Sequence, residues 1–431
     1  MRIPLFLMFI VASFVSSNNF AQKKSNQLPP TALTRWMDLH CRMVRASKGI
    51  PHVAYSRHFA YTAIAVYESI VGSDPDYQSL SGQLTGLGNL PPIPENSLFW
   101  PASLNTTYAE MLRSFYGRFA SCTQTIDSME ESQKRAFINA GTGQPVVEKS
   151  AGFGKLIAGA ILQWASEDGS ASTKQYTPLK GEGVWTPVAQ AATPFWAENR
   201  ALTNNLESAF ALEQPGYSAD TAGNFWKMAM EVYNTSVKLT PEQKATALYW
   251  DDSPNGQYMT VFGHWTFLLS GLLNERRTPL IKAAEAYARM AISMQEASIL
   301  AWKGKYQYNV VRPVTFIQQY IDPGWKPLIA TPPHPEFPAA HATLSNAAAM
   351  ALCSVLGYDC KVTDKSYTDI GMPKRNYVSL QDAAKEAGLS RLYGGIHYRY
   401  SIHQGFILGE ATAKHIDQSI RFRSQRSVTL R

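Results

Sequence analysis

Residues 57–71 read RHFAYTAIAVYESIV, and their apolar side chains recur at the spacing of an α-helix. Phe59, Ala63 and Val66 lie three or four positions apart, which places them on one face of a helix. Residues 31–47 repeat this pattern. Both segments are therefore predicted to be amphipathic helices.

The rest of the chain continues the helical pattern. Further helices are predicted at residues 104–119, 146–164, 219–236, 241–250, 258–272, 283–303, 341–356, 380–389 and 403–420. Residues 73–101 and 170–199 are interrupted by proline and polar residues and are predicted to be irregular. The sequence shows no strand alternation, βαβ rhythm or internal repeat. We therefore predict an all-α fold, a helical bundle assembly.

The N-terminus has the features of a cleavable secretory signal. Arg2 precedes an apolar run at residues 3–15, and a polar stretch then leads to Ala21. The run is too short to span a bilayer comfortably, so residues 1–21 are predicted to be a signal peptide and residues 22–431 a single domain. We expect an exported protein, periplasmic or secreted, without a stable membrane anchor.

The basic residues outnumber the acidic ones, which gives the chain a formal net charge of +7. Lysines and arginines are scattered, without the dense runs and interleaved aromatic residues of a nucleic-acid-binding surface. A small anionic substrate therefore explains the charge better than nucleic acid does.

The chain has four cysteines, at positions 41, 122, 353 and 360. Export would permit disulfides, and the short interval between Cys353 and Cys360 would be the easiest to close. The alternative is that all four are buried thiols. Their spacing does not resemble a zinc site.

Four of the nine histidines fall between residues 334 and 403, close to the most informative cations. Lys305 and Arg312 are seven residues apart, and on a helix this spacing places both on one face. Pro313 favours an extended residue before it, so Arg312 is expected near a helix terminus. Such a pair commonly belongs to a solvated helix face, but it can also converge on one anion.

Two further segments place a histidine beside small residues. Residues 335–341 read PEFPAAH and lead into an alanine-rich helix, whose first-turn N–H groups attract anions near His341. Residues 390–397 read SRLYGGIH, and the paired glycines permit a tight loop that brings Arg391 and His397 to one centre. Each segment alone has a structural explanation. Together they predict an oxyanion cage with two imidazoles.

These segments resemble the motifs of a known superfamily. Residues 305–313 fit Lys-x6-Arg-Pro, residues 338–341 stand where that family has Pro-Ser-Gly-His, and residues 390–397 fit Ser-Arg-x5-His. The chain is thus similar to the vanadium-dependent haloperoxidases and type 2 phosphatidic acid phosphatases.

The wider context looks more like the bacterial vanadium haloperoxidase-like branch than like the phosphatases. Residues 250–252 (WDD) and 263–265 (GHW) are examples, and the resemblance covers most of the mature chain. It implies two packed helical bundles, with the oxyanion site in residues 300–405.

The resemblance implies vanadate as the cofactor. His397 would bind the vanadium through a ring nitrogen, and His341 would be the acid–base histidine. The vanadate oxygens would be held by Lys305, Arg312, Arg391 and the backbone N–H of Ala340. The enzyme would oxidise a halide with hydrogen peroxide, iodide or bromide more easily than chloride. The resulting hypohalous acid would then react with a small organic acceptor.

The sequence departs from the family pattern at two positions. Ala339 replaces the motif serine, so we expect that a serine restored there raises halide oxidation, bromide more than iodide. The alternative is that Ala339 packs against an apolar wall. Ser401 stands where the extended motif has an aspartate, and His403 or Glu410 could then be the partner of His397.

Two other functions remain open at this stage. An acid phosphatase could use the same oxyanion site, because phosphate shares the charge and shape of vanadate and His397 could serve as the nucleophile. A catalytically weakened binding protein could keep the scaffold alone, and the departures at Ala339 and Ser401 favour that interpretation.

Overall fold

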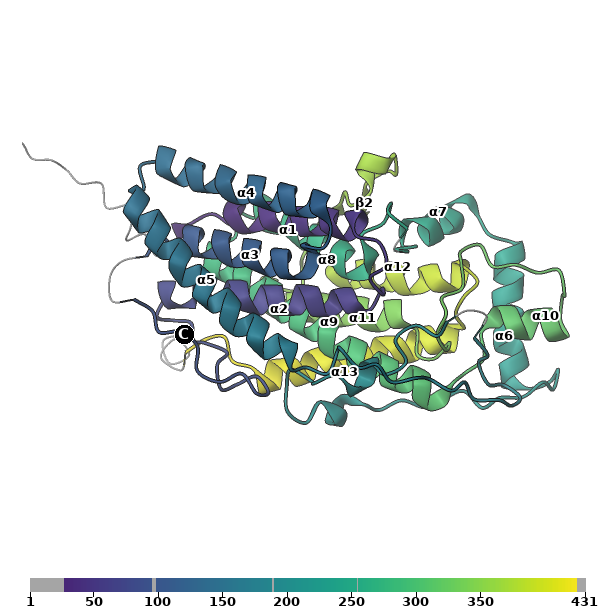
Figure 1. Cartoon of the computed structure of the whole chain (residues 1–431). Coiled ribbons are helices and arrows are strands. Elements are labelled where there is room, and N and C mark those ends of the chain that lie inside the picture. The colour runs from purple at the N-terminus through teal and green to yellow at the C-terminus, as the bar shows by residue number, and fades with distance from the viewer. Residues whose placement is uncertain (1–26, 95–97, 188–189, 254, 425–431) are drawn as a thin grey trace, which may run out of the picture.

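The computed structural model describes residues 27–94, 98–187, 190–253 and 255–424, which are drawn as a coloured ribbon in Figure 1. These residues form thirteen α-helices, a few short 3-10 turns and one two-stranded hairpin. The predicted all-α fold is confirmed. The predicted signal peptide lies outside the described residues. Among the helices that the structure describes, none is long and apolar enough to cross a membrane.

Five helices from the first part of the chain pack together on one side of the molecule (Figure 1). They are α1 (Thr31–Ala46), α2 (Ala54–Glu68), α3 (Trp100–Tyr116), α4 (Ala120–Asn139) and α5 (Gln144–Ser166). The two helices with which the sequence argument began, α1 and α2, are both present. α2 buries every residue except Ala54 and Arg57, because it lies between α3 and α9 and is covered on several sides.

The second bundle is centred on α11 (Ala340–Leu356), which packs against α9 (Leu280–Tyr308), α12 (Leu380–Tyr393) and α13 (Arg399–Ser419). α8 (Thr260–Glu275) packs beside α1, and α2 packs beside α9. One hydrophobic cluster therefore runs through both bundles. The shorter helices at the edge are α6 (Asn224–Val237), α7 (Pro241–Tyr249) and α10 (Pro313–Tyr320).

Three elements were not predicted from the sequence. Only Cys122, Ile126 and Gln133 of α4 are buried, so this helix lacks the broad apolar stripe that reveals a helix in a sequence. α10 has eight residues, too few to show a period. The hairpin pairs β1 (Val362–Asp364) with β2 (Arg375–Tyr377), and strands of three residues show no alternation.

The four cysteines are buried thiols. Cys353 lies in the last turn of α11 and Cys360 follows the end of that helix, yet they are not bonded to each other. The disulfide that their spacing permitted is therefore not formed, and the alternative of buried thiols is confirmed.

Candidate active site

A cavity of about 390 Å³ lies where the second bundle meets the connection between α1 and α2. Its titratable lining residues are His52, Asp251, Asp252, His334, His341, Arg391 and His397. Much of the remaining lining is apolar and includes Trp302, Leu344 and Ile396. The cavity thus brings together both histidines and one of the three cations that the sequence singled out.

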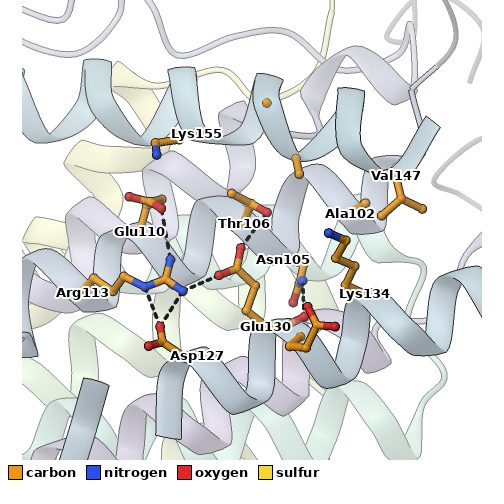
Figure 2. Close-up of a pocket in the computed structure, with 13 residues that line it drawn as sticks. Ala102, Asn105, Thr106, Glu110, Arg113, Asp127, Glu130, Lys134, Val147 and Lys155 are labelled. Atoms are coloured by element: carbon orange, nitrogen blue, oxygen red, sulfur yellow. Dashed lines mark hydrogen bonds and ion pairs between the residues drawn. The ribbon is translucent and has the colours of Figure 1, made fainter. Parts of the chain in front are cut away.

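A second hollow, between α3, α4 and α5, is shown in Figure 2. Arg113 lines it and pairs with Glu110, Asp127 and Glu130. These charges largely neutralise one another, and no histidine or cysteine lines the hollow. The chemistry of the chain is therefore assigned to the first cavity.

Lys305 and Arg312 both lie close to His397, but they do not share a face of one helix. α9 ends at Tyr308, because Asn309 takes a left-handed conformation with φ of 47°. Arg312 is extended, as Pro313 predicts, and α10 starts directly after it. The expectation of a shared helix face is wrong, since the chain turns between the two cations.

Lys305 is fully buried, and its ammonium donates three hydrogen bonds to backbone carbonyls. The acceptors are the oxygens of Pro335 at 3.0 Å, Glu336 at 3.2 Å and Pro338 at 2.7 Å. Burial lowers the pKa of Lys305 well below its usual value, and the charge of Arg312 lowers it further. All three donors are in use, so Lys305 can act on an anion mainly through its charge.

Arg312 is also buried, and its guanidinium contacts both the segment that carries His334 and the segment that carries His397. Its Nε donates to the backbone oxygen of His334 at 3.0 Å, and its Nη1 donates to that of Ile396 at 2.8 Å. Nη1 also lies 3.1 Å from Nε2 of His397, and Nη2 lies 2.9 Å from Nδ1 of His334. Lys305 and Arg312 are not among the described residues that line the cavity.

His397 is held in one tautomer by its two neighbours. Nδ1 lies 2.8 Å from Oε1 of Glu336. Burial raises the pKa of Glu336 to about 7, and its hydrogen bond with Ser401 opposes this shift. Above that pH the ionised carboxylate can only accept, so Nδ1 carries the proton. Nε2 then has the lone pair and accepts from Arg312. Burial and the charges of Arg312 and Lys305 lower the pKa of His397 well below its usual value, which favours this neutral ring.

Glu336, and not His403 or Glu410, is the carboxylate partner of His397. His403 and Glu410 are exposed on α13, whereas Glu336 is fully buried. Ser401 donates to Oε2 of Glu336 at 2.6 Å, so the serine that replaces the motif aspartate supports another carboxylate. Glu336 is 61 residues from His397 in the chain, which is why no spacing revealed it.

His341 is the second residue of α11, with 11% of its side chain exposed. Burial, followed by the charge of Arg391, lowers its pKa to about 3, so the ring is neutral near pH 7 and can accept a proton. Its Nε2 is 3.4 Å from Oδ2 of Asp252, and this carboxylate opposes the fall in the pKa of His341. Within the described part of the chain, both atoms lack a hydrogen-bond partner.

Arg391 is the cation that lines the cavity directly. Its Nε donates to Oγ of Ser390 at 3.1 Å, and its Nη2 donates to the backbone oxygen of Trp250. Burial lowers its pKa to about 10, and the nearby carboxylates of Asp252 and Asp251 oppose this shift. Arg391 therefore remains a cation at neutral pH.

The two alanines before His341 face different surroundings. Ala340 is the first residue of α11 and lines the cavity, and a first-turn amide has no acceptor within its own helix. Ala339 belongs instead to the apolar cluster that contains Phe337 and Ile402. It is not among the described lining residues, which supports the apolar-wall interpretation and removes the basis for expecting that a serine there raises halide oxidation.

Sequence reasoning missed His52, His334 and Asp252 as lining residues. His52 precedes α2, far from the three motifs, so no spacing connected it with them. Asp252 belongs to the WDD triplet that resembles the haloperoxidase branch, and this triplet was the one available signal.

The comparisons with known proteins agree with this geometry. A family model described as the VCPO second helical-bundle domain matches residues 320–424. The structure also resembles the crystal structure of the first bacterial vanadium-dependent iodoperoxidase, with a TM-score of 0.85 and 27% sequence identity. That match covers 92% of this chain and 98% of the other. The matched region of the chain is thus similar to a vanadium chloroperoxidase domain, and the chain as a whole is similar to a bacterial vanadium-dependent iodoperoxidase.

Two crystal structures of bacterial vanadium-dependent chloroperoxidases show the shared fold. The apo-type vanadium-dependent chloroperoxidase has a TM-score of 0.66 and 14% identity, over 86% of this chain and 95% of that one. The holo-type enzyme has a TM-score of 0.62 and 15% identity, over 93% and 94%. No curated protein matches the sequence.

The residues fit the vanadate of the vanadium haloperoxidase family. The guanidinium groups of Arg312 and Arg391 are buried near His397 and keep their charge at neutral pH, and a bound anion would balance that charge. The lone pair on Nε2 of His397 is the form in which an imidazole binds a metal, with Nδ1 held by a carboxylate. Among the described residues there is no cluster of three or more His, Cys, Asp or Glu side chains that could hold a metal cation.

Proposed function

We propose that the chain is a vanadate-dependent haloperoxidase that oxidises iodide or bromide with hydrogen peroxide to hypohalous acid. The observation that supports this most is the orientation of His397, whose Nδ1 is held by Glu336 while Nε2 faces Arg312. His341, the proposed acid–base histidine, lines the same cavity as His397, the proposed vanadium ligand.

Each residue has a distinct part in the proposed reaction. Nε2 of His397 would hold the vanadate, and Arg391 with the amide of Ala340 would contact its oxygens from the cavity wall. Bound vanadate would supply a Lewis acid that activates hydrogen peroxide. Neutral His341 would accept the proton that the peroxide loses. Arg312, which lies at Nε2 of His397, would stabilise negative charge there together with Lys305.

The cavity lining favours a large halide over a small one. A halide must lose water to enter a space lined by Trp302, Leu344 and Ile396, and the desolvation cost falls as the radius of the ion increases. Iodide is also easier to oxidise than chloride. We therefore place iodide first, bromide second and chloride last.

The same histidine and carboxylate pair is also compatible with an acid phosphatase. A neutral His397 backed by Glu336 has the form of a nucleophile, and the oxyanion site would accept phosphate. We keep this as the second candidate. For the location, we propose export to the periplasm or the medium, supported by the signal-like residues 1–21.

The proposed function is tested by reconstituting the purified chain with orthovanadate. We expect about one vanadium per chain and peroxide-dependent formation of triiodide from iodide, measured beside bromide oxidation and p-nitrophenyl phosphate hydrolysis. Inorganic phosphate should compete with vanadate for the site. Hydrolysis without halide oxidation would replace the proposal with the phosphatase, and neither activity in a vanadium-loaded chain would indicate a binding protein.

A further inference from the structure

A further pocket, of about 580 Å³, adjoins the active-site cavity and is called the side pocket below. The two hollows share Pro51, Ala192 and Thr193 as lining residues. The charged residues that line the side pocket are Arg57 and Lys174, and no acidic residue is among its described lining residues. The side pocket therefore offers positive charge and hydrogen-bond donors to a ligand.

His58 of α2 lines the side pocket and ends a chain of buried hydrogen bonds. The hydroxyl of Tyr287 lies 3.0 Å from that of Tyr108, which lies 3.3 Å from Nδ1 of His40. Nε2 of His40 lies 3.0 Å from the hydroxyl of Tyr116, which lies 3.2 Å from Nδ1 of His58. Burial lowers the pKa of both histidines, so each ring is neutral near pH 7 and carries one proton.

The inner end of this chain fixes the direction of its hydrogen bonds. Tyr287 has no other hydrogen-bond partner among the described residues, so its buried O–H donates to Tyr108 or stays unpaired at a cost. Tyr108 then donates to Nδ1 of His40, and Nε2 of that ring donates to Tyr116. Tyr116 in turn donates to Nδ1 of His58, which leaves the proton of His58 on Nε2. Since Nε2 makes no hydrogen bond to another described residue, this N–H is available to a ligand in the side pocket.

Asn199 supplies a second donor to the side pocket. Its side chain is buried and lines the pocket, and within the described part of the chain its Nδ2 has no hydrogen-bond partner. Buried polar groups in proteins are normally hydrogen-bonded, so this amide points to a ligand that accepts. One pocket thus presents two unpaired N–H donors, from His58 and Asn199.

The charges of the side pocket favour an anion with a single charge. Arg57 is paired with Asp168, and Lys174 is paired with Glu198, so the excess positive charge is small. An anion with several charges would therefore be poorly balanced there. Residues 194–196, which include two aromatic side chains, make part of the wall apolar. Such a wall favours an ion that loses its water easily, and a large halide does so more easily than a small one.

We propose that the side pocket binds a monovalent, weakly hydrated anion such as iodide, held by the Nε2–H of His58 and the amide of Asn199. This site is separate from the cavity proposed to hold vanadate. Binding depends only on the geometry of the side pocket, whereas its use to hold halide beside that cavity rests on the proposed function.

Binding is tested by calorimetric titration of the full chain with sodium iodide, and with sodium sulfate at equal ionic strength. We expect saturable binding of iodide and at least tenfold weaker binding of sulfate. Iodide should bind equally well when orthovanadate is present, because the oxyanion site is elsewhere. The proposal is overturned if iodide does not bind, if sulfate binds as tightly, or if orthovanadate abolishes the binding of iodide.

The two donors are tested by His58→Phe and Asn199→Asp, with Asn376→Asp as the control. Phenylalanine keeps the ring that stacks on Phe115 but has no N–H, and aspartate keeps the size of asparagine but replaces its donor with a charged acceptor. Each should weaken iodide binding about tenfold or more, as the loss of one hydrogen bond to an ion predicts. Asn376 is exposed on β2 and does not line the side pocket, so the same added charge should have no effect there.

Asn199→Asp alone can refute the site, because the amide Nδ2 of Asn199 makes no hydrogen bond within the described residues that the substitution would break. Undiminished iodide binding in that variant would overturn the proposal even if His58→Phe did not fold. These titrations contain no peroxide, so their outcome is independent of triiodide formation, which tests the proposed function.

Discussion

Glu336 is the carboxylate that contacts His397, although the two residues are 61 positions apart in the chain. It accepts from Nδ1 of His397, from the amide of Tyr398 at 3.0 Å and from Ser401. Three donors orient this carboxylate, and the carboxylate orients the histidine. A partner of this kind sets both the direction and the tautomer of a metal-binding imidazole.

Glu336→Gln should weaken vanadate binding about 10- to 100-fold, the usual effect of losing the partner of a metal-binding histidine. The glutamine keeps the size of the side chain but removes its charge. Glu410→Gln on α13 is the matched control, because Glu410 is exposed and should be neutral. The measurement is a titration of the apo chain with orthovanadate. Equal effects of the two substitutions would show that Glu336 does not orient His397.

The two histidines of the cavity should respond differently to alanine. His341→Ala should retain vanadium and lose turnover by about 10²- to 10⁴-fold, the usual contribution of an acid–base group. His397→Ala should lose vanadium, because its remaining contacts are only ionic and hydrogen-bonding. Metal analysis after gel filtration, together with the turnover number for iodide, separates these outcomes. Two variants with the same vanadium content would contradict the assignment of roles.

At the scale of elements, two glycines let α13 approach α11 closely. A Cβ atom at Gly409 would lie 2.4 Å from the backbone oxygen of Thr343, and one at Gly405 would lie 2.8 Å from that of Ala339. These helices carry His341 and follow His397, so their close approach helps to hold the two histidines at one cavity.

Gly409→Ala should therefore reduce the free energy of unfolding by about 1–3 kcal/mol, the usual cost of overpacking. Gly271→Ala on α8 is the control, since a Cβ atom there meets nothing within 4 Å. That change should be neutral or stabilise by about 0.5–1 kcal/mol, because alanine favours a helix more than glycine does. Chemical unfolding measures both. A neutral Gly409→Ala would mean that the helices separate at little cost.

Ala339 occupies the N-cap position of α11, where no side chain accepts a hydrogen bond from the first turn. Serine is a favoured N-cap residue, so Ala339→Ser should cap the helix rather than reach the cavity. We expect unchanged or slightly higher thermal stability and an unchanged ratio of bromide to iodide oxidation. Thermal melts and steady-state assays test this. A selective rise in bromide oxidation would restore the direct role that the family motif suggests.

At the scale of the whole molecule, a buried charge network joins the hairpin to the helices. Nε2 of His264 on α8 lies 2.7 Å from Asp364 of β1, and Nδ1 lies 3.0 Å from Asp252. Burial alone would lower the pKa of His264, but the charges of Asp364 and Asp252 raise it to about 10. Burial would raise the pKa of Asp252, but the His264 imidazolium holds it below its usual value. The network thus fixes Asp252 beside His341.

The raised pKa of His264 predicts a pH dependence of stability. Its contribution is fully present below about pH 6.5, where the unfolded histidine is also protonated, and it is lost as the pH rises toward 10. The loss is at most about 1.4 kcal/mol per pH unit. His264→Gln should remove this dependence, so its destabilisation should be larger at pH 6 than at pH 9.5. Urea unfolding at both values, with His403→Gln as control, measures it. An equal destabilisation at both pH values would contradict the prediction.

The sequence by itself determined most of the helices and predicted which residues to expect at the candidate site. Helical periodicity is a local property, so α1, α9 and α11 could be predicted from their own residues, although α9 runs farther at both ends than the predicted 283–303. The three motifs identified His341, Arg391 and His397 because each keeps its functional residues within a few positions.

Only the tertiary structure decided how these residues are supported. Glu336 meets His397, and His52 meets His341, because helices distant in the chain pack together. Ala339 packs in an apolar cluster, and the ammonium of Lys305 donates hydrogen bonds to backbone carbonyls. These contacts leave no local pattern in the sequence. The partner of a buried polar group is whichever segment the fold places within about 3 Å of it.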